Sequence, residues 1–203
     1  MIRRREFQAA LAAAVLAPGP ARAQPIELAG VRYEPQVTVA GTRLLLNGAG
    51  IRYKALFKVY TAGLYLTARA STAEAVQAMP GPKRVHVSML RDIDANELGK
   101  LFTRGMEQNS TREEFVRAIA GTMRMSEVFF VKKRLLAGET FSIDWMPGSG
   151  TVVRVNGQAQ NDPVVEPEFY NALLRIWLGH SPADSLLKDA LLGVAAPRNE
   201  LIR

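Results

Sequence analysis

The chain has 203 residues, 48% of them apolar, and a formal charge of +7. This length and composition suit one domain with a full hydrophobic core. The absence of cysteine excludes disulfides, thiolate metal sites and a cysteine nucleophile. His86 and His180 lie far apart with no companion at ligand spacing, so the sequence predicts no metal site and no cofactor.

Residues 1–23 have the form of a secretory signal peptide, with a basic start, a short Ala-rich apolar run and Ala21-Arg22-Ala23 before Gln24. The apolar run is too short to cross a bilayer. Arg4-Arg5-Glu6-Phe7 also fits a twin-arginine signal. We therefore expect cleavage after Ala23 and a periplasmic or secreted protein without a transmembrane segment.

Removal of residues 1–23 would lower the formal charge from +7 to +4. The remaining basic residues are scattered, whereas a nucleic-acid interface needs Lys and Arg clustered on one face. The sequence therefore predicts no nucleic-acid partner.

Residues 37–66 are predicted to form strands. A short strand ends at Asn47-Gly48, and Gly48-Ala49-Gly50 is expected to form a turn before Arg52. The run from Lys58 to Leu66 is apolar on both alternating faces, which is typical of a strand buried on both sides.

Residues 71–135 are predicted to contain three helices and one strand. Ser71 with Glu74 and Thr111 with Glu114 match capping boxes, and Asp94 begins a further helix. Residues 83–90 alternate as a strand, and Arg91 at its end is expected to pair with Asp92 or Asp94. Apolar spacing predicts two inward-facing stripes: Leu98, Leu101, Phe102 and Met106 on one helix, and Phe115, Ile119, Met123 and Met125 on the next.

Residues 139–193 return to strands and then helices. Two strands flank the turn at 147–150, and Asn156-Gly157 indicates another hairpin. Pro167 is placed at the first position of a helix that ends at Gly179, and Ser181-Pro182 is expected to open the last helix. The chain is thus predicted to be one α+β domain, followed by a loose tail at 194–203.

Three stretches resemble the chalcone isomerase-like superfamily, in its bacterial exported branch. They are LNGAGIRYKALFKVYTAGLYL, GPKRVHVSMLRDI and FYNALLRIWLGHSPADSLLKDALLG. The resemblance covers residues 35–193, with residues 24–34 as a lead-in. It implies an open-faced β-sandwich, in which a large antiparallel sheet packs against helices with a ligand cleft between them.

The resemblance also implies where site residues fall. The catalytic arginine of the plant enzymes matches Arg52, and their catalytic threonine falls at Tyr60. Their active-site tyrosine falls near Leu98, and a late threonine falls near Ile176. The neighbouring asparagine of the plant enzymes falls near Gly105, or near Asn109 if a gap is allowed.

The arginine is thus kept while most of the substrate-binding hydroxyl groups are absent, which favours binding over catalysis. We expect Arg52 and Tyr60 to bind a hydrophobic carboxylate or phenolic small molecule, such as a fatty acid, between sheet and helices. A structural or partner-binding envelope protein remains an alternative, in which Arg52 pairs with an acidic neighbour or turn carbonyls. Isomerase activity, as an intramolecular lyase, is the second alternative. The oligomeric state is left open.

Overall fold

The computed structural model describes residues 24–194. The expected signal peptide, residues 1–23, and residues 195–203 of the expected tail lie outside this range. The strands are β1 (Ile26–Leu28), β2 (Val31–Tyr33), β3 (Gln36–Val39), β4 (Thr42–Lys54), β5 (Phe57–Leu66), β6 (Lys83–Met89), β7 (Ile93–Asp94), β8 (Arg134–Leu135), β9 (Thr140–Met146), β10 (Gly150–Val155) and β11 (Gln158–Ala159). The helices are α1 (Ala73–Ala78), α2 (Ala95–Gln108), α3 (Arg112–Lys132), α4 (Pro167–Leu178) and α5 (Ser185–Leu191). None of these helices is long and apolar enough to span a bilayer.

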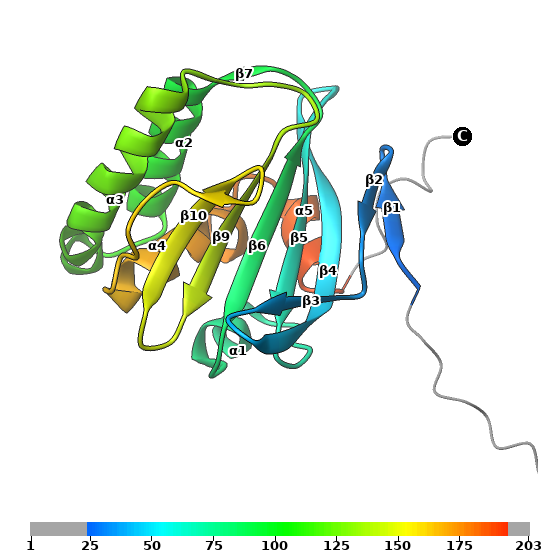
Figure 1. Cartoon of the computed structure of the whole chain (residues 1–203), viewed down its shortest axis with the longest axis horizontal. Helices are drawn as coiled ribbons and strands as arrows, with labels where there is room; N and C mark the ends of the chain where they lie inside the picture. Colours follow the sequence, from blue (N-terminus) through cyan, green and yellow to red (C-terminus); the bar gives the residue numbers. More distant parts are fainter. Residues whose placement is uncertain (1–23, 195–203) are drawn as a thin grey trace, which may run out of the picture.

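Within the described range, seven strands form one antiparallel sheet in the order β11-β10-β9-β6-β5-β4-β3. Figure 1 shows α2, α3 and α4 grouped beside the β9–β10 side of this sheet, with α5 behind β4 and β5. The main core fills the space between sheet and helices. This arrangement confirms the predicted α+β class and open-faced β-sandwich.

The β1–β2 hairpin covers the other face of the sheet at the β3–β4 side, where it encloses a second, smaller core. Tyr33 donates a hydrogen bond to Thr61 Oγ1 at 2.7 Å, and its ring packs over Gly63. Much of the rest of this face is polar, with Arg84, His86, Ser142, Asp144 and Arg154 lining a shallow hollow. Its centre is Asp144, which is 1% exposed and accepts hydrogen bonds from Arg84 and Arg154.

Strand β5 confirms the prediction of a strand buried on both sides, because the residues from Val59 to Leu66 are all buried. Alternate residues of one face, including Tyr60 and Leu64, enter the main core. Tyr65 on the opposite face enters the smaller core. A strand in the middle of the sheet thus joins the two cores.

The expected turn at Gly48-Ala49-Gly50 is wrong, because these residues lie inside the long strand β4. The strand bulges at Asn47 and continues to Lys54. A Cβ atom on Gly48 would lie 2.0 Å from the carbonyl oxygen of Ala190, and one on Gly50 would lie 2.7 Å from Ala190 Cβ. The two glycines therefore let helix α5 pack directly on the strand.

Helix caps agree with the sequence at α2, α3 and α4. Asp94 accepts the amide of Glu97, Thr111 and Glu114 form the predicted capping box, and Pro167 begins α4. Helix α1 instead starts one residue later than expected, with Thr72 as its cap.

The inward stripe expected on α3 is partly wrong. Ile119 is 40% exposed and Met123 is 63% exposed, whereas Met125 is buried. Helix α3 packs against α2 and α4 through a face that includes Ala118 and Gly121. A Cβ atom on Gly121 would lie 2.4 Å from the ring of Phe169. The small residues decide which face packs, because only they allow this close approach between helices.

Candidate functional site

Arg52 lies on β4, opposite Tyr60 on β5. The register of the two strands shifts between Arg52 and Tyr53, so a bulge adjoins the arginine. The guanidinium carbon of Arg52 lies 5.5 Å from the centroid of the Tyr60 ring. The strand pair therefore places a cation against an aromatic face at the boundary between sheet and helices.

These two side chains border a cavity of about 160 Å³. Its other walls come from α2, α4 and the segment 181–183. Most of these residues are apolar, and the polar ones are Arg104, Gln108 and Ser181. Leu98 and Phe102 of α2 and Ile176 of α4 are buried, whereas Leu101 of α2 is partly exposed at the rim. The expected cleft between sheet and helices is thus present, and it is small.

Arg52 has no ionic partner within residues 24–194, and its buried Nε atom has no hydrogen-bond acceptor there. Asp184 is bonded to the residue that follows Arg52, because its Oδ2 accepts the amide of Tyr53 at 3.0 Å. Its Oδ1 accepts the amides of Leu186 and Leu187. Both carboxylate oxygens of Asp184 therefore accept backbone amides, and Asp184 forms no ion pair with the Arg52 guanidinium.

Tyr60 is 1% exposed, and its hydroxyl oxygen accepts a hydrogen bond from Trp177 Nε1 at 2.9 Å. Burial raises the pKa of Tyr60 to about 12, although the Arg52 charge and the Trp177 hydrogen bond oppose the rise. The phenol is therefore neutral at pH 7. No residue in 24–194 accepts its proton in a hydrogen bond, so Tyr60 can donate one to a ligand.

The structure brings most of the sequence-aligned positions to this one cavity. Arg52, Tyr60, Leu98, Gly105 and Ile176 all line it. The alternative position Asn109 does not line the cavity, and its buried side chain has a different role. It donates to the carbonyl of Ser181 and accepts the amide of Ser181, both at 2.8 Å.

Asn109 and Asp184 together hold the segment 181–183 as a wall of the cavity. The sequence placed the start of the last helix at Ser181, which is wrong, because Asp184 is the cap and α5 begins at Ser185. Sequence analysis also missed the contact of Trp177 with Tyr60. A buried indole usually requires an acceptor for its N–H, and this is the only signal that could have indicated such a partner.

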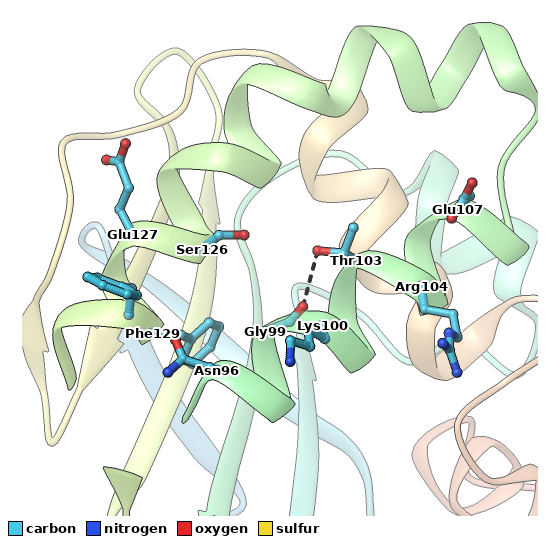
Figure 2. Close-up of a pocket in the computed structure, with 10 residues that line it drawn as sticks. Asn96, Gly99, Lys100, Thr103, Arg104, Glu107, Ser126, Glu127 and Phe129 are labelled. Atoms are coloured by element: carbon cyan, nitrogen blue, oxygen red, sulfur yellow. Dashed lines mark hydrogen bonds between the residues drawn. The ribbon is translucent and has the colours of Figure 1, made fainter. Parts of the chain in front are cut away.

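A larger hollow of about 540 Å³ lies between α2 and α3 (Figure 2). Lys100 and Glu107 stand on its α2 side and Glu127 on its α3 side, and the Thr103 hydroxyl is bonded to the carbonyl of Gly99. Its charged side chains are solvent-exposed and of both signs. Arg104 reaches both hollows, but of the two only the smaller one is bordered by a half-buried arginine, Arg52, whose buried Nε has no acceptor within residues 24–194.

Comparisons with a protein family and with solved structures agree with this fold. The sequence model of a family described as chalcone isomerase-like matches residues 24–193. No curated protein matches the chain. Among solved structures, that of an Arabidopsis thaliana fatty-acid binding protein is similar, with a TM-score of 0.63 at 12% sequence identity. The match covers 83% of this chain and 96% of that chain, and at this identity it shows a common fold.

Proposed function

Because this chain belongs to the chalcone isomerase-like family, we propose that its domain binds a compact hydrophobic acid, a carboxylate or a phenolate, without transforming it. The observation that carries the proposal is the buried Nε of Arg52, which borders the cavity and has no acceptor within residues 24–194. A buried charged donor without an acceptor is destabilising. An anionic ligand that supplies acceptor oxygens removes this penalty and gains affinity from the charge-assisted hydrogen bond.

The polar groups suit one oxyanion. Arg52 offers its guanidinium from β4, and Tyr60 offers a phenol proton from β5. Trp177 donates to the phenol oxygen, which leaves the phenol proton free to donate to a ligand. Leu98, Phe102 and Ile176 then enclose the apolar part of the ligand.

Cavity size restricts the ligand further. At about 160 Å³, the cavity is comparable to an engineered protein cavity of about 150 Å³ that binds benzene. One aromatic ring, or a short acyl chain, fills such a space. The fatty-acid binding protein of similar fold supports a hydrophobic carboxylate as the ligand class, but a long acyl chain would have to leave the cavity past Leu101 and Arg104.

The apolar residues that line the cavity make isomerisation unfavourable. The resemblance aligns Leu98 and Ile176 with polar residues of the plant enzymes, and both are apolar and buried here. Loss of one donor to developing negative charge costs about 3 kcal/mol of transition-state stabilisation. Arg52 and Tyr60 retain a means of binding an anion, but not the set of donors that stabilises an enolate.

Titration of the purified protein with small probes tests the proposal. Benzoate, hexanoate, palmitate and uncharged benzyl alcohol can be compared by two-dimensional NMR, with shifts mapped onto α2 and β5. We expect benzoate and hexanoate to bind more tightly than benzyl alcohol and to shift residues around the cavity. Arg52→Gln should weaken benzoate binding about tenfold or more, whereas Arg112→Gln, on the exposed start of α3, should leave it unchanged.

The other outcomes decide between the alternatives. Absence of benzoate and hexanoate binding, or equal affinity in Arg52→Gln, would contradict a ligand site and leave the structural or partner-binding role. Turnover of a hydroxychalcone by the parent protein that Arg52→Gln abolishes would show an isomerase instead.

We further propose that the domain acts outside the cytoplasm after removal of residues 1–23. Support comes from the basic and apolar start of the chain and from Ala21-Arg22-Ala23. The family match begins at residue 24, directly after the expected cleavage site. Intact mass measurement of the protein from a cell fraction tests this: a periplasmic species that starts at Gln24 is expected, and an uncleaved cytoplasmic chain would contradict it.

A further inference from the structure

The turn between β4 and β5 presents apolar side chains to solvent. Strand β4 ends at Lys54 and strand β5 begins at Phe57, so Ala55 and Leu56 form the turn. Leu56 is 93% exposed and Phe57 is 61% exposed. Among the large apolar residues of the described range, Leu56 is the most exposed. Adjacent exposed apolar side chains are candidates for contact with a protein partner or a membrane, where further observations support such a contact.

The residues of this turn are not those that turn geometry favours. Ala55 has φ 52°, in the left-handed region that favours glycine and asparagine. The same chain uses the favoured pair at the β10–β11 turn, where Asn156 and Gly157 have φ 48° and 81°. Ala29 and Ala40 also have positive φ at the β1–β2 and β3–β4 turns, but glycine follows each of them, whereas the exposed Leu56 follows Ala55. The backbone does not require a large apolar side chain at position 56, which points to a use for that side chain.

Basic side chains surround the turn. Lys54 and Lys58 flank it in sequence, and the guanidinium carbon of Arg91 lies 4.7 Å from the centroid of the Phe57 ring. The expected pairing of Arg91 with Asp92 or Asp94 is wrong. Asp92 accepts from Arg134 and from the amide of Ala137, and Asp94 caps α2.

Neighbouring loops add to this charge. The amide of Leu90 donates to the carbonyl of Val59, which ties the loop 90–94 to the hairpin. Figure 1 shows the hairpin tip at the same end of the molecule as β7 and the segment that follows α3. Residues 54–58, 90–94 and 132–139 contain six basic and three acidic residues, a net charge of +3. Asp92 and Glu139 are paired with Arg134 and Lys132.

We propose that this end of the molecule docks onto an anionic lipid surface. Leu56 and Phe57 enter the headgroup region, while Lys54, Lys58 and Arg91 lie against lipid phosphates. Apolar insertion and attraction of basic residues to anionic lipids add together in this type of contact. A projecting two-residue tip suits a bilayer better than a protein partner, because a stable protein interface buries about 800 Å² on each side.

The proposed contact is independent of the ligand site but lies close to it. Arg52 and Phe57 stand on the two strands of the same hairpin. Arg52 precedes the turn residue Ala55 by three positions, which corresponds to roughly 10 Å along a strand. A domain docked in this way holds its cavity near the lipid surface.

Vesicle sedimentation of the purified protein tests the contact, with phosphatidylcholine vesicles that contain phosphatidylglycerol and with phosphatidylcholine alone. We expect binding to the anionic vesicles and its loss at high salt. The double variant Ala55→Asn/Leu56→Gly should bind about tenfold more weakly, because it loses the apolar side chain. Its stability should be close to that of the parent protein, because Leu56 is 93% exposed and asparagine tolerates the left-handed φ of position 55. Lys54→Gln/Lys58→Gln should also bind more weakly, whereas Val116→Ser and Arg112→Gln, at the far end of α3, should bind as the parent does.

The cysteine-free sequence offers a second readout. Leu56→Cys can be labelled at a single site with an environment-sensitive fluorophore, and its emission should shift to the blue on anionic vesicles, while that of labelled Val116→Cys should not. Equal binding of Ala55→Asn/Leu56→Gly and the parent, or no binding to anionic vesicles, would overturn the proposal. Arg52→Gln should leave vesicle binding unchanged, which separates this result from that of the ligand test.

Discussion

Arg52 and Tyr60 face each other across strands β4 and β5, with the guanidinium carbon 5.5 Å from the centre of the phenol ring. The ring offers the cation its aromatic face, and Trp177 holds the phenol oxygen. Neither contact gives an acceptor to Arg52 Nε. The pair therefore keeps a cation beside the cavity while a donor stays available to a ligand.

Replacement of Arg52 should stabilise the free protein. Arg52→Met removes a half-buried charged side chain whose buried Nε has no acceptor within residues 24–194, and it keeps a flexible apolar stem. We expect the free energy of unfolding to rise by about 1–2 kcal/mol, while benzoate binding is lost. Urea denaturation without ligand measures the first effect. Arg84→Met is the control, and it should lower the free energy of unfolding, because Arg84 is bonded to buried Asp144. A loss of stability in Arg52→Met would show that the guanidinium has a structural role.

Removal of the Tyr60 hydroxyl should destabilise the protein although the ring remains. Tyr60→Phe leaves the buried N–H of Trp177 without its acceptor, 2.9 Å away in the native structure. The expected loss is about 1–3 kcal/mol, measured by thermal and urea unfolding. In a Trp177→Phe background the same substitution should cost clearly less, since no N–H is left unpaired. Equal costs in both backgrounds would contradict the coupling.

Glycine at position 48 should be essential for packing of α5. A Cβ atom there would lie 2.0 Å from the carbonyl oxygen of Ala190, so Gly48→Ala must displace the helix. We expect a loss of about 1–3 kcal/mol or more. Gly99→Ala, inside α2, is the matched control, because the nearest contact of its Cβ atom would be an ordinary 3.6 Å to Phe129 of α3. Alanine there should raise stability by about 0.5–1 kcal/mol, and a similar loss at both positions would contradict the packing argument.

Acid should weaken the contact between α3 and α4. Two hydrogen bonds from Arg175 to Glu114, at 2.8 and 2.9 Å, and the amide of Thr111 lower the Glu114 pKa from 4.5 to about 2. The folded-state pKa is below the unfolded one. This contribution to stability is therefore complete above pH 4.5 and is lost as the pH falls toward 2.

Arg175→Met tests this pH dependence. The variant should lose about 1.5–3 kcal/mol at pH 7, and its deficit relative to the parent should shrink as the pH falls from 4.5 to 2. Chemical denaturation across this range measures both curves. A deficit that stays constant with pH would show that the Arg175–Glu114 pair is not its origin.

Features that depend on neighbouring residues could be read from the sequence. Asp94, Thr111 and Pro167 begin helices because a cap or a missing amide acts on the adjacent turn. The buried strand β5 was visible because both of its alternating faces are apolar. The alignment of Arg52 and Tyr60 with family positions likewise placed them in one region, and the structure shows both at one cavity.

Features that depend on distant segments were misread. Gly48-Ala49-Gly50 matches a turn locally, but its function is to accept α5, which lies about 140 residues further along the chain. On α3 more than one face carries apolar residues, and periodicity could not tell that the face with Gly121 packs while Ile119 and Met123 stay exposed. The predicted ionic partner of Arg91 was also wrong. Its guanidinium instead lies over the ring of Phe57, which is distant in sequence and is brought close by the fold.

The sequence by itself determined the fold class, the starts of α2, α3 and α4, and the identity of the cation at position 52, since each follows from local chemistry or from a motif. Only the tertiary structure decided that this cation has no acidic partner within residues 24–194 and that its cavity holds about 160 Å³. The physical reason is that partners and volumes are set by side chains from β4, β5, α2 and α4 together. No single stretch of the chain contains that information.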